Sequence, residues 1–316
     1  VELMARFDEE ANINWAERLE RAGAQVVYGV FGLKTHAKLA LVLRRERDRQ
    51  GRARLVPYAH LGTGNYHPRT TRLYTDFGLL TADPAICDDV NEVFLHITSL
   101  ARAGRLKRLL LAPFTMHRRV LELIRREARH ARAGRPARIV AKMNALTEEG
   151  VIRALCQASQ AGVKIELVVR GACALRPGVR GVSDNIRVRS IVGRFLEHHR
   201  IWYFENDGKP DVWLTSADWM GRNLFKRIEV AFPVRDPEAP ELTIEKLVGV
   251  YRVLIPRKIA AYTFHLNATS HITDAPTMRS LSAGSRARAA VPSSTSIGTS
   301  TSRSARGIHC ARSKAA

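Results

Sequence analysis

A histidine and a lysine two residues apart, His36 and Lys38, have types and a spacing that could do chemistry. They stand where a glycine-containing loop enters the apolar run 39–43, which is typical of a buried strand. Residues two apart in a strand point to the same face. Neutral imidazole is nucleophilic near pH 7 and needs no base to remove a proton first. Beside a fixed positive charge, it suits chemistry on phosphate groups.

A second signal is the segment 62–65, with the sequence Gly-Thr-Gly-Asn, which closes a strand predicted at 56–61. Its two glycines let backbone amides approach an anion closely. Arg72 and Tyr74 follow within a short reach. The arginine-rich stretch 44–54, between the two signals, is predicted to be a solvated hairpin.

The elements around the first signal follow a strand–helix–strand plan. We expect a strand at 1–7, then a helix with Trp15 and Leu19 on its apolar face, and a parallel strand at 25–28. Because residue 1 falls inside a predicted strand, we expect a chain truncated at its amino terminus.

The second half repeats this plan. It has a predicted strand at 137–143, a helix capped by Thr147 and a strand at 163–169. The segment 197–200, Glu-His-His-Arg, then enters another apolar run, and a later strand ends in the small polar loop 215–219. The sequence therefore predicts a degenerate internal duplication, with a histidine and a cation in each copy.

Length and net charge indicate what kind of partner this chain binds. The chain has 316 residues and a formal net charge of +21, which is enough length for two domains and implies an anionic partner. No apolar run approaches the length of a transmembrane helix. From residue 277 onward there is no acidic residue, so this end is predicted to be disordered and to inflate the net charge. The cysteines show no metal-binding spacing, and Cys87, Cys156 and Cys173 are interpreted as buried thiols.

Several motifs occur in a fixed order: Val1–Asn12, Lys34–Lys38, Leu73–Asp76, Val182–Arg187 and Ser216–Met220. Together they resemble the C-terminal catalytic half of the long, multidomain polyphosphate kinases, over roughly residues 1–235. His-x-Lys followed by Gly-Thr-x-Asn also resembles the phosphate site of the phospholipase D-like superfamily. The resemblance implies an α/β fold with two phospholipase D-like domains related by a pseudo-twofold duplication. We expect these domains at 1–105 and 106–270, followed by a disordered tail at 271–316.

The resemblance also implies roles for single residues. His36 matches the histidine that is phosphorylated during turnover. His198 matches the second histidine, either as the proton donor to the departing nucleotide or as an orienting group, while His199 is expected to be exposed on the opposite side. The expected nucleotide contacts are Tyr74, Arg170 and His198. The expected phosphate-path residues are Lys38, Asn65, Arg72, Lys142, Asn144 and Arg187. Arg6 is expected to hold the phosphates that carry Mg²⁺, and Asp76 and Asp218 to orient basic partners.

The implied reaction is reversible transfer of the terminal phosphate of ATP to inorganic polyphosphate through phospho-His36. The implied partners are ATP, ADP, polyphosphate and, in the full-length enzyme, a second copy of the chain, with no nucleic acid. We expect a cytoplasmic protein, either free or at the inner face of the membrane. Two alternatives are a phospholipase D-like phosphodiesterase or nuclease, and a non-catalytic polyanion-binding protein. The missing second His-x-Lys argues against the first, and two equivalently placed histidines argue against the second.

Overall fold

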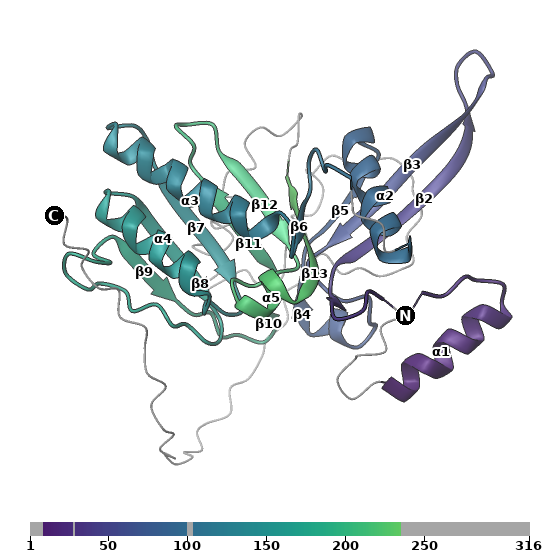
Figure 1. Cartoon of the computed structure of the whole chain (residues 1–316), viewed down its shortest axis with the longest axis horizontal. Helices are drawn as coiled ribbons and strands as arrows, with labels where there is room; N and C mark the ends of the chain where they lie inside the picture. Colours follow the sequence, from purple (N-terminus) through teal and green to yellow (C-terminus); the bar gives the residue numbers. More distant parts are fainter. Residues whose placement is uncertain (1–8, 28, 100–103, 235–316) are drawn as a thin grey trace, which may run out of the picture. The chain divides into compact units, whose positions relative to one another are not determined.

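In the computed structural model, the described residues are 9–27, 29–99 and 104–234 (Figure 1). The predicted strand at 1–7, with Arg6, and the predicted tail at 271–316 lie outside them. Among the described helices, none combines the length and the apolar character needed to cross a bilayer.

A mixed eight-stranded sheet forms the centre of the described fold. Its strand order is β1-β13-β12-β11-β7-β8-β9, and β6 pairs with β13 beside β1. The strands β7, β8 and β9 are parallel, whereas β11, β12 and β13 run antiparallel to their neighbours in turn. The α/β class is therefore confirmed. The strands are β1 (Lys34–Thr35), β6 (Leu110–Ala112), β7 (Arg138–Met143), β8 (Lys164–Val169), β9 (Ile186–Arg189), β11 (Arg200–Phe204), β12 (Asp211–Thr215) and β13 (Arg227–Pro233).

Both faces of this sheet are buried, because its residues alternate between two cores. Ala141 and Trp202 face the core shared with α3 (Met116–Arg132) and α4 (Glu149–Gln160). Their neighbours Val140 and Ile201 face a second core, shared with α2 (Pro84–Ser99). The period of two along each strand thus sorts apolar side chains into two layers.

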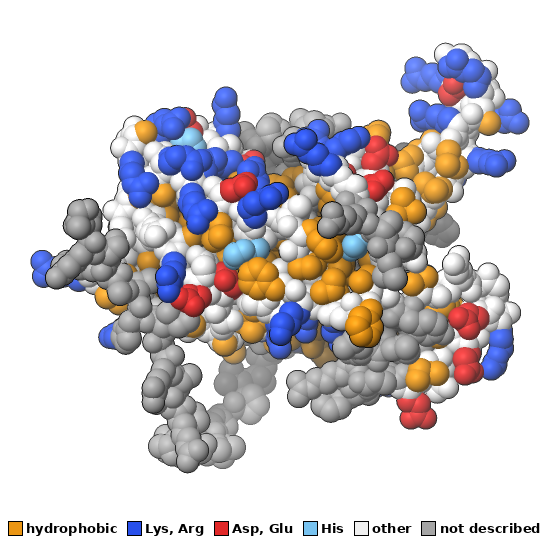
Figure 2. Space-filling model, viewed as in Figure 1, with side chains coloured by type: hydrophobic (Ala, Val, Ile, Leu, Met, Phe, Trp, Pro, Cys, Tyr) orange, Lys and Arg blue, Asp and Glu red, His pale blue; other side chains and the backbone are white. Residues whose placement is uncertain are grey.

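A smaller antiparallel sheet packs against that second core. It contains β2 (Lys38–Arg47), β3 (Ala53–Gly62) and β5 (Gly78–Thr81), and the outer part of β2 and β3 is the predicted solvated hairpin. Its tip carries a dense group of arginine side chains (Figure 2). A third, two-stranded sheet joins β4 (Tyr74–Thr75) to β10 (Leu196–Glu197) in parallel.

The same topology follows both histidines. His36 is followed by the antiparallel meander β2-β3-β5, and His198 by the meander β11-β12-β13. This is the arrangement that the duplicated plan predicts. The domain boundaries at 105 and 270 stay predictions, since β1 of the first half is hydrogen-bonded to β13 of the second.

Two expectations for the first half were wrong. The helix α1 (Glu9–Arg21) forms as predicted, but Trp15 and Leu19 are 55% and 42% exposed and Ala16 is the buried residue. Periodicity fixes which side chains share a face, but not whether a partner covers it. Residues 25–27 of the second predicted strand are not in a strand, and the chain then turns through Gly29, which has a φ of +85°.

The second half corrects two details. The helix α4 is capped by the carboxylate of Glu148, which accepts hydrogen bonds from the amides of Gly150 and Val151, and not by Thr147. Cys173 is exposed because it lies in the loop after β8, whereas Cys87 and Cys156 are buried as predicted. The remaining helical elements are η1 (Thr70–Arg72) and α5 (Gly221–Phe225).

Candidate active site

The predicted site residues converge on one edge of the large sheet. The parallel strands β7 and β8 end there, at Met143 and Val169, and the antiparallel neighbour β11 begins there at Arg200. In α/β sheets, ligands bind outside the carboxyl ends of the strands.

His36 is held by a carboxylate from the other half of the chain. Its Nδ1 lies 2.8 Å from Oε2 of Glu229, which is fully buried on β13. Ser216 and Asn223 donate further hydrogen bonds to this carboxylate, at 2.5 and 2.6 Å. A carboxylate accepts hydrogen bonds, so Nδ1 carries the proton and Nε2 keeps its lone pair.

The backbone around His36 is not the regular strand that the His-x-Lys spacing predicts. The amides of His36 and Ala37 both donate to the carbonyl of Ile228, at 2.9 Å each. Two residues of one strand opposite a single residue of the partner strand form a β-bulge, which changes the direction of a side chain. The bulge places His36 between β1 and β2, and Nζ of Lys38 donates to the His36 carbonyl at 2.5 Å.

Charge and burial set the protonation of this pair. Burial lowers the pKa of His36 below its ordinary value of 6.5, although the hydrogen bond and charge of Glu229 oppose the shift. Burial also lowers the pKa of Lys38 to about 7, with the charge of Glu229 opposing it. At neutral pH His36 is therefore a neutral imidazole beside a half-charged ammonium.

His198 mirrors His36, with an acid from the first half. Its Nδ1 lies 2.8 Å from Oδ1 of Asp76, which also accepts a hydrogen bond from Thr63. Burial lowers the pKa of His198, against the hydrogen bond of Asp76. Each histidine is thus oriented by a carboxylate of the opposite half. Lys38 lies within electrostatic range of both rings, since its charge lowers the pKa of each.

Arg200 is buried between His198 and Asp218. Its NH1 lies 3.1 Å from Nε2 of His198 and 2.6 Å from the His198 carbonyl, while Nε and NH2 each lie 3.2 Å from Asp218. Burial alone would raise the pKa of Asp218, but the charge and hydrogen bonds of Arg200 hold it below its ordinary value. Asp76 and Asp218 therefore orient basic partners, as predicted.

The expectation that His199 is exposed was wrong. Its ring is buried, packs edge-on against Phe77 and hydrogen-bonds to Thr75 on one nitrogen and to Nζ of Lys142 on the other. The register of β4 beside β10 brings Thr75 next to this ring. Lys142 also pairs with Glu197 at 2.7 Å, and burial lowers its pKa to about 8. Lys142 is therefore an internal support of the site, and its ammonium is not presented to solvent.

Arg170 and Tyr74 lie beside the second histidine. Arg170 donates to the side chain of Asn144 at 2.6 Å and to the carbonyl of Glu197 at 2.8 Å. The ring of Tyr74 lies 5.1 Å from that of His198. The other predicted phosphate-path residues are exposed. Asn65 follows Gly64, which abuts Asp76; Arg72 lies in η1; and Arg187 lies on the edge strand β9.

The residue that sequence reasoning missed is Glu229. It stands in the apolar stretch Ile228–Pro233, and an acid inside a buried strand needs a partner. That mismatch is the signal that could have found it, but the partner lies 193 residues away in the chain.

The acids at the site do not fit a magnesium ion held by the protein. Asp76, Asp218 and Glu229 are each engaged by a histidine or an arginine, and among the described residues no group of three or more His, Cys, Asp or Glu could hold a metal. Magnesium is commonly bound through substrate phosphates. The cations at the site, Lys38 and Arg200, fit the phosphates that would carry it.

The site therefore brings two carboxylate-held histidines to one cationic edge of an α/β sheet, an arrangement suited to chemistry on phosphate groups. Two family profiles match the chain: "Polyphosphate kinase C-terminal domain 1" over residues 1–103 and "Polyphosphate kinase C-terminal domain 2" over residues 109–278. The chain belongs to the polyphosphate kinase family.

Individual relatives agree with these profiles. The chain is 64% identical over 250 residues to a polyphosphate kinase of Burkholderia ambifaria (strain MC40-6), covering 79% of this chain and 36% of that protein. It is 61% identical over 246 residues to one of Neisseria meningitidis serogroup B, covering 78% and 35%. The crystal structure of polyphosphate kinase from Porphyromonas gingivalis superposes with a TM-score of 0.70 at 40% identity, covering 82% and 38%. The chain therefore spans little more than a third of these relatives.

Proposed function

We propose that this chain is the catalytic part of a polyphosphate kinase that transfers the terminal phosphate of ATP to inorganic polyphosphate through phospho-His36. The observation that carries the proposal is the hydrogen bond between Nδ1 of His36 and the buried Glu229. It leaves Nε2 unprotonated and gives the ring one orientation. That is the state in which an imidazole attacks phosphorus.

The transfer takes place in two displacements. In the first, a bond forms between Nε2 of His36 and the terminal phosphorus of ATP, and the bond from that phosphorus to the ADP oxygen breaks. In the second, the terminal oxygen of a polyphosphate chain attacks the same phosphorus, and the bond to Nε2 breaks. Both displacements run in reverse, so the same residues form ATP from polyphosphate and ADP.

Lys38 and Arg200 neutralise the phosphates during these displacements, since phosphoryl transfer needs mainly positioning and charge. We assign His198 an orienting role in the resting site. Its lowered pKa and the Arg200 NH1 at 3.1 Å favour a neutral ring whose Nε2 accepts a hydrogen bond. A bound phosphate that draws Arg200 away would raise the pKa of His198 and allow it to donate a proton.

The remaining parts of the proposal follow from the same family. Tyr74 and Arg170 contact the nucleotide, and Mg²⁺ arrives on the phosphates with Arg6 beside them. The complete enzyme assembles as a homo-oligomer in the cytoplasm or at the inner membrane face. Fractionation of cells and the native mass of the enzyme test these last points.

The central test is labelling. This chain, alone and completed with the amino-terminal part of the Burkholderia ambifaria relative, is incubated with ATP labelled in the terminal phosphate. We expect label that is lost in acid and kept in base, and that disappears in His36→Ala. The control is His130→Ala, which removes a histidine of α3 and should keep the label. Label that survives in His36→Ala would overturn the assignment.

A further inference from the structure

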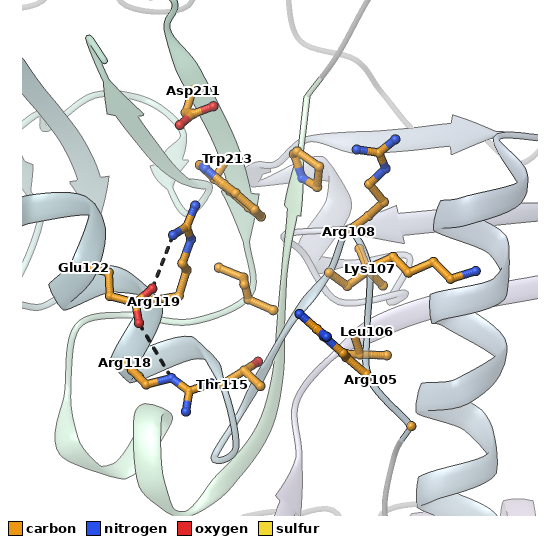
Figure 3. A pocket seen from close by; sticks show the side chains of 14 residues that line it. Arg105, Leu106, Lys107, Arg108, Thr115, Arg118, Arg119, Glu122, Asp211 and Trp213 are labelled. Atoms are coloured by element: carbon orange, nitrogen blue, oxygen red, sulfur yellow. Dashed lines mark hydrogen bonds and ion pairs between the residues drawn. The ribbon is translucent and has the colours of Figure 1, made fainter. Parts of the chain in front are cut away.

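A second basic hollow lies away from the histidines. It has a volume of about 440 Å³, is open to solvent on one side and is lined by residues 104–110, the start of α3 and the strands β12 and β13 (Figure 3). Its cationic lining residues are Arg105, Lys107, Arg108, Arg118 and Arg119. We call it the linker pocket, because residues 104–110 connect the two halves of the chain. Its volume lies in the range of pockets that bind small ligands.

The charge of the linker pocket is not neutralised by its own acids. Glu122 pairs with Arg118 and Arg119 at 3.7 and 3.2 Å, and Asp211 pairs with Arg126 at 2.6 Å. Neither Arg105 nor Arg108 forms an ion pair with a carboxylate within the described part of the chain. Among the described residues, the lining of the pocket therefore carries a positive excess that an anion would neutralise.

The backbone that carries these cations is fixed. Asp89 is 2% exposed, and its carboxylate accepts hydrogen bonds from the amides of Lys107, Arg108 and Leu109, at 2.9, 2.6 and 2.8 Å. The amide of Gly104 donates to Glu92 at 3.1 Å. A segment anchored at both ends presents its side chains from one backbone conformation, so binding an anion there orders little further chain.

The linker pocket and the histidines lie at opposite ends of β12. Asp211 and Trp213 line the pocket, whereas Thr215 pairs with Arg200 of β11 at the histidine edge. At roughly 3.3 Å per residue, Thr215 lies about 13 Å from Asp211. Trp213 is only 8% exposed, so little of its ring is open to a stacked base. The pocket thus has cationic side chains but little aromatic surface on which a nucleobase could stack. It therefore fits a phosphate chain better than a nucleotide.

We propose that the linker pocket binds a stretch of inorganic polyphosphate distant from the end that reacts at His36. The inference rests on the proposed function for the choice of anion. A long chain would occupy both sites at once, and simultaneous binding at two sites raises affinity steeply with length. A short polyphosphate reaches one site only. The linker pocket would therefore give the protein a higher affinity for long chains than for short ones.

The test compares two double variants of the full chain. Arg105→Gln with Arg108→Gln removes two guanidiniums of the linker pocket that form no ion pair with a carboxylate among the described residues. Arg45→Gln with Arg54→Gln removes the same charge from the exposed β2–β3 hairpin. Fluorescence anisotropy measures the binding of end-labelled tripolyphosphate and of long-chain polyphosphate, and the melting temperature checks that each variant folds.

We expect the pocket variant to weaken long-chain binding by about tenfold, with a shallower salt dependence between about 50 and 200 mM salt. Tripolyphosphate binding should change by less than about twofold, and the hairpin control should keep the wild-type preference for length. Restoring charge with Arg105→Lys and Arg108→Lys should recover most of the affinity. Equal losses in the pocket variant and the hairpin control would overturn the inference.

Two further outcomes separate this inference from the proposed reaction. If His36 takes no label from ATP but the pocket variant still loses long-chain binding, the reaction is wrong and the pocket assignment stands. If the pocket variant loses binding of a single-stranded oligonucleotide as strongly as that of polyphosphate, the pocket is a nucleic-acid surface and the inference is overturned.

Discussion

Glu229 is the residue on which the state of His36 depends. A glutamine at this position can turn its NH2 toward Nδ1, which would then accept a hydrogen bond, and the proton would move to Nε2. We expect Glu229→Gln to slow phosphorylation of His36 by about 10- to 100-fold, which is the usual cost of losing the carboxylate that orients a metal-ligating histidine. Single-turnover labelling from ATP measures this rate.

A matched control for this change is Glu166→Gln on β8, which breaks a partly exposed pair with Arg138 on β7. It should leave the labelling rate within about twofold, since surface pairs contribute little. An unchanged rate in Glu229→Gln, in a variant that keeps its melting temperature, would show that the carboxylate does not set the state of His36.

Lys38 predicts a dependence on pH. Its pKa of about 7 means that the ammonium is charged below this pH and neutral above it. The affinity of the histidine site for polyphosphate should therefore fall as the pH rises through about 7. On the acid side, the rate of labelling depends on His36, whose pKa lies below 6.5. Labelling should therefore fall only when the pH drops below that value, because a protonated ring cannot attack phosphorus.

Lys38→Arg tests the alkaline side, because a guanidinium stays charged throughout this range. We expect the variant to bind tripolyphosphate equally at about pH 6.5 and about pH 8.5, although its turnover falls. The measurement is the dissociation constant as a function of pH. The same alkaline loss in Lys38→Arg would assign that titration to another group.

At the scale of elements, three helices end in the same way. After α1, α3 and α4 a glycine with positive φ follows, and the next amide reaches back to a carbonyl five residues earlier, as in Ala24 to Leu19 and Val163 to Ala158. Gly162 has a φ of +96°, and a Cβ there would meet no atom within 4 Å. The cost of a side chain at this position is therefore one of backbone conformation alone.

We expect Gly162→Ala to lower the free energy of unfolding by about 1–2 kcal/mol, the cost of the left-handed conformation for a residue with a Cβ. Gly193→Ala is the control, since this glycine also has open space but no positive φ, and it should change stability by less than about 0.5 kcal/mol. Urea unfolding of both variants gives the comparison. Equal values would mean that the helix end tolerates the strain.

Helix ends and buried strands were predictable from the sequence because their signals are local. A glycine after an apolar period ends α4, and apolar runs mark β7 and β8. The short strands β1, β4 and β10 were not predictable, since each exists only through a partner far along the chain. His36 and His198 were found from their spacing and their resemblance to a family. Glu229 and the burial of His199 depend on tertiary contacts that no local pattern carries.

At the scale of the whole described molecule, Ile228 lies at the junction of the two halves. It is fully buried, pairs with Thr35 through β1 and packs in the core shared with α2. We expect Ile228→Ala to destabilise the protein by about 2–5 kcal/mol and to lower His36 labelling in proportion to the unfolded fraction. Denaturant unfolding followed by tryptophan fluorescence measures the first effect. Loss of stability below about 1 kcal/mol would mean that the halves fold independently of this contact.

Each histidine is oriented by a carboxylate from the other half of the chain, and this has a consequence for the order of events during synthesis. His36 leaves the ribosome before Glu229, and at about 5–20 residues per second the 193 residues from His36 to Glu229 take about 10–40 s to make. Throughout that interval His36 lacks the Glu229 carboxylate that accepts a hydrogen bond from its Nδ1. A nascent chain therefore gains an oriented His36 ring with a free Nε2 only when synthesis has passed β13, so we expect an interrupted translation product not to take phosphate from ATP.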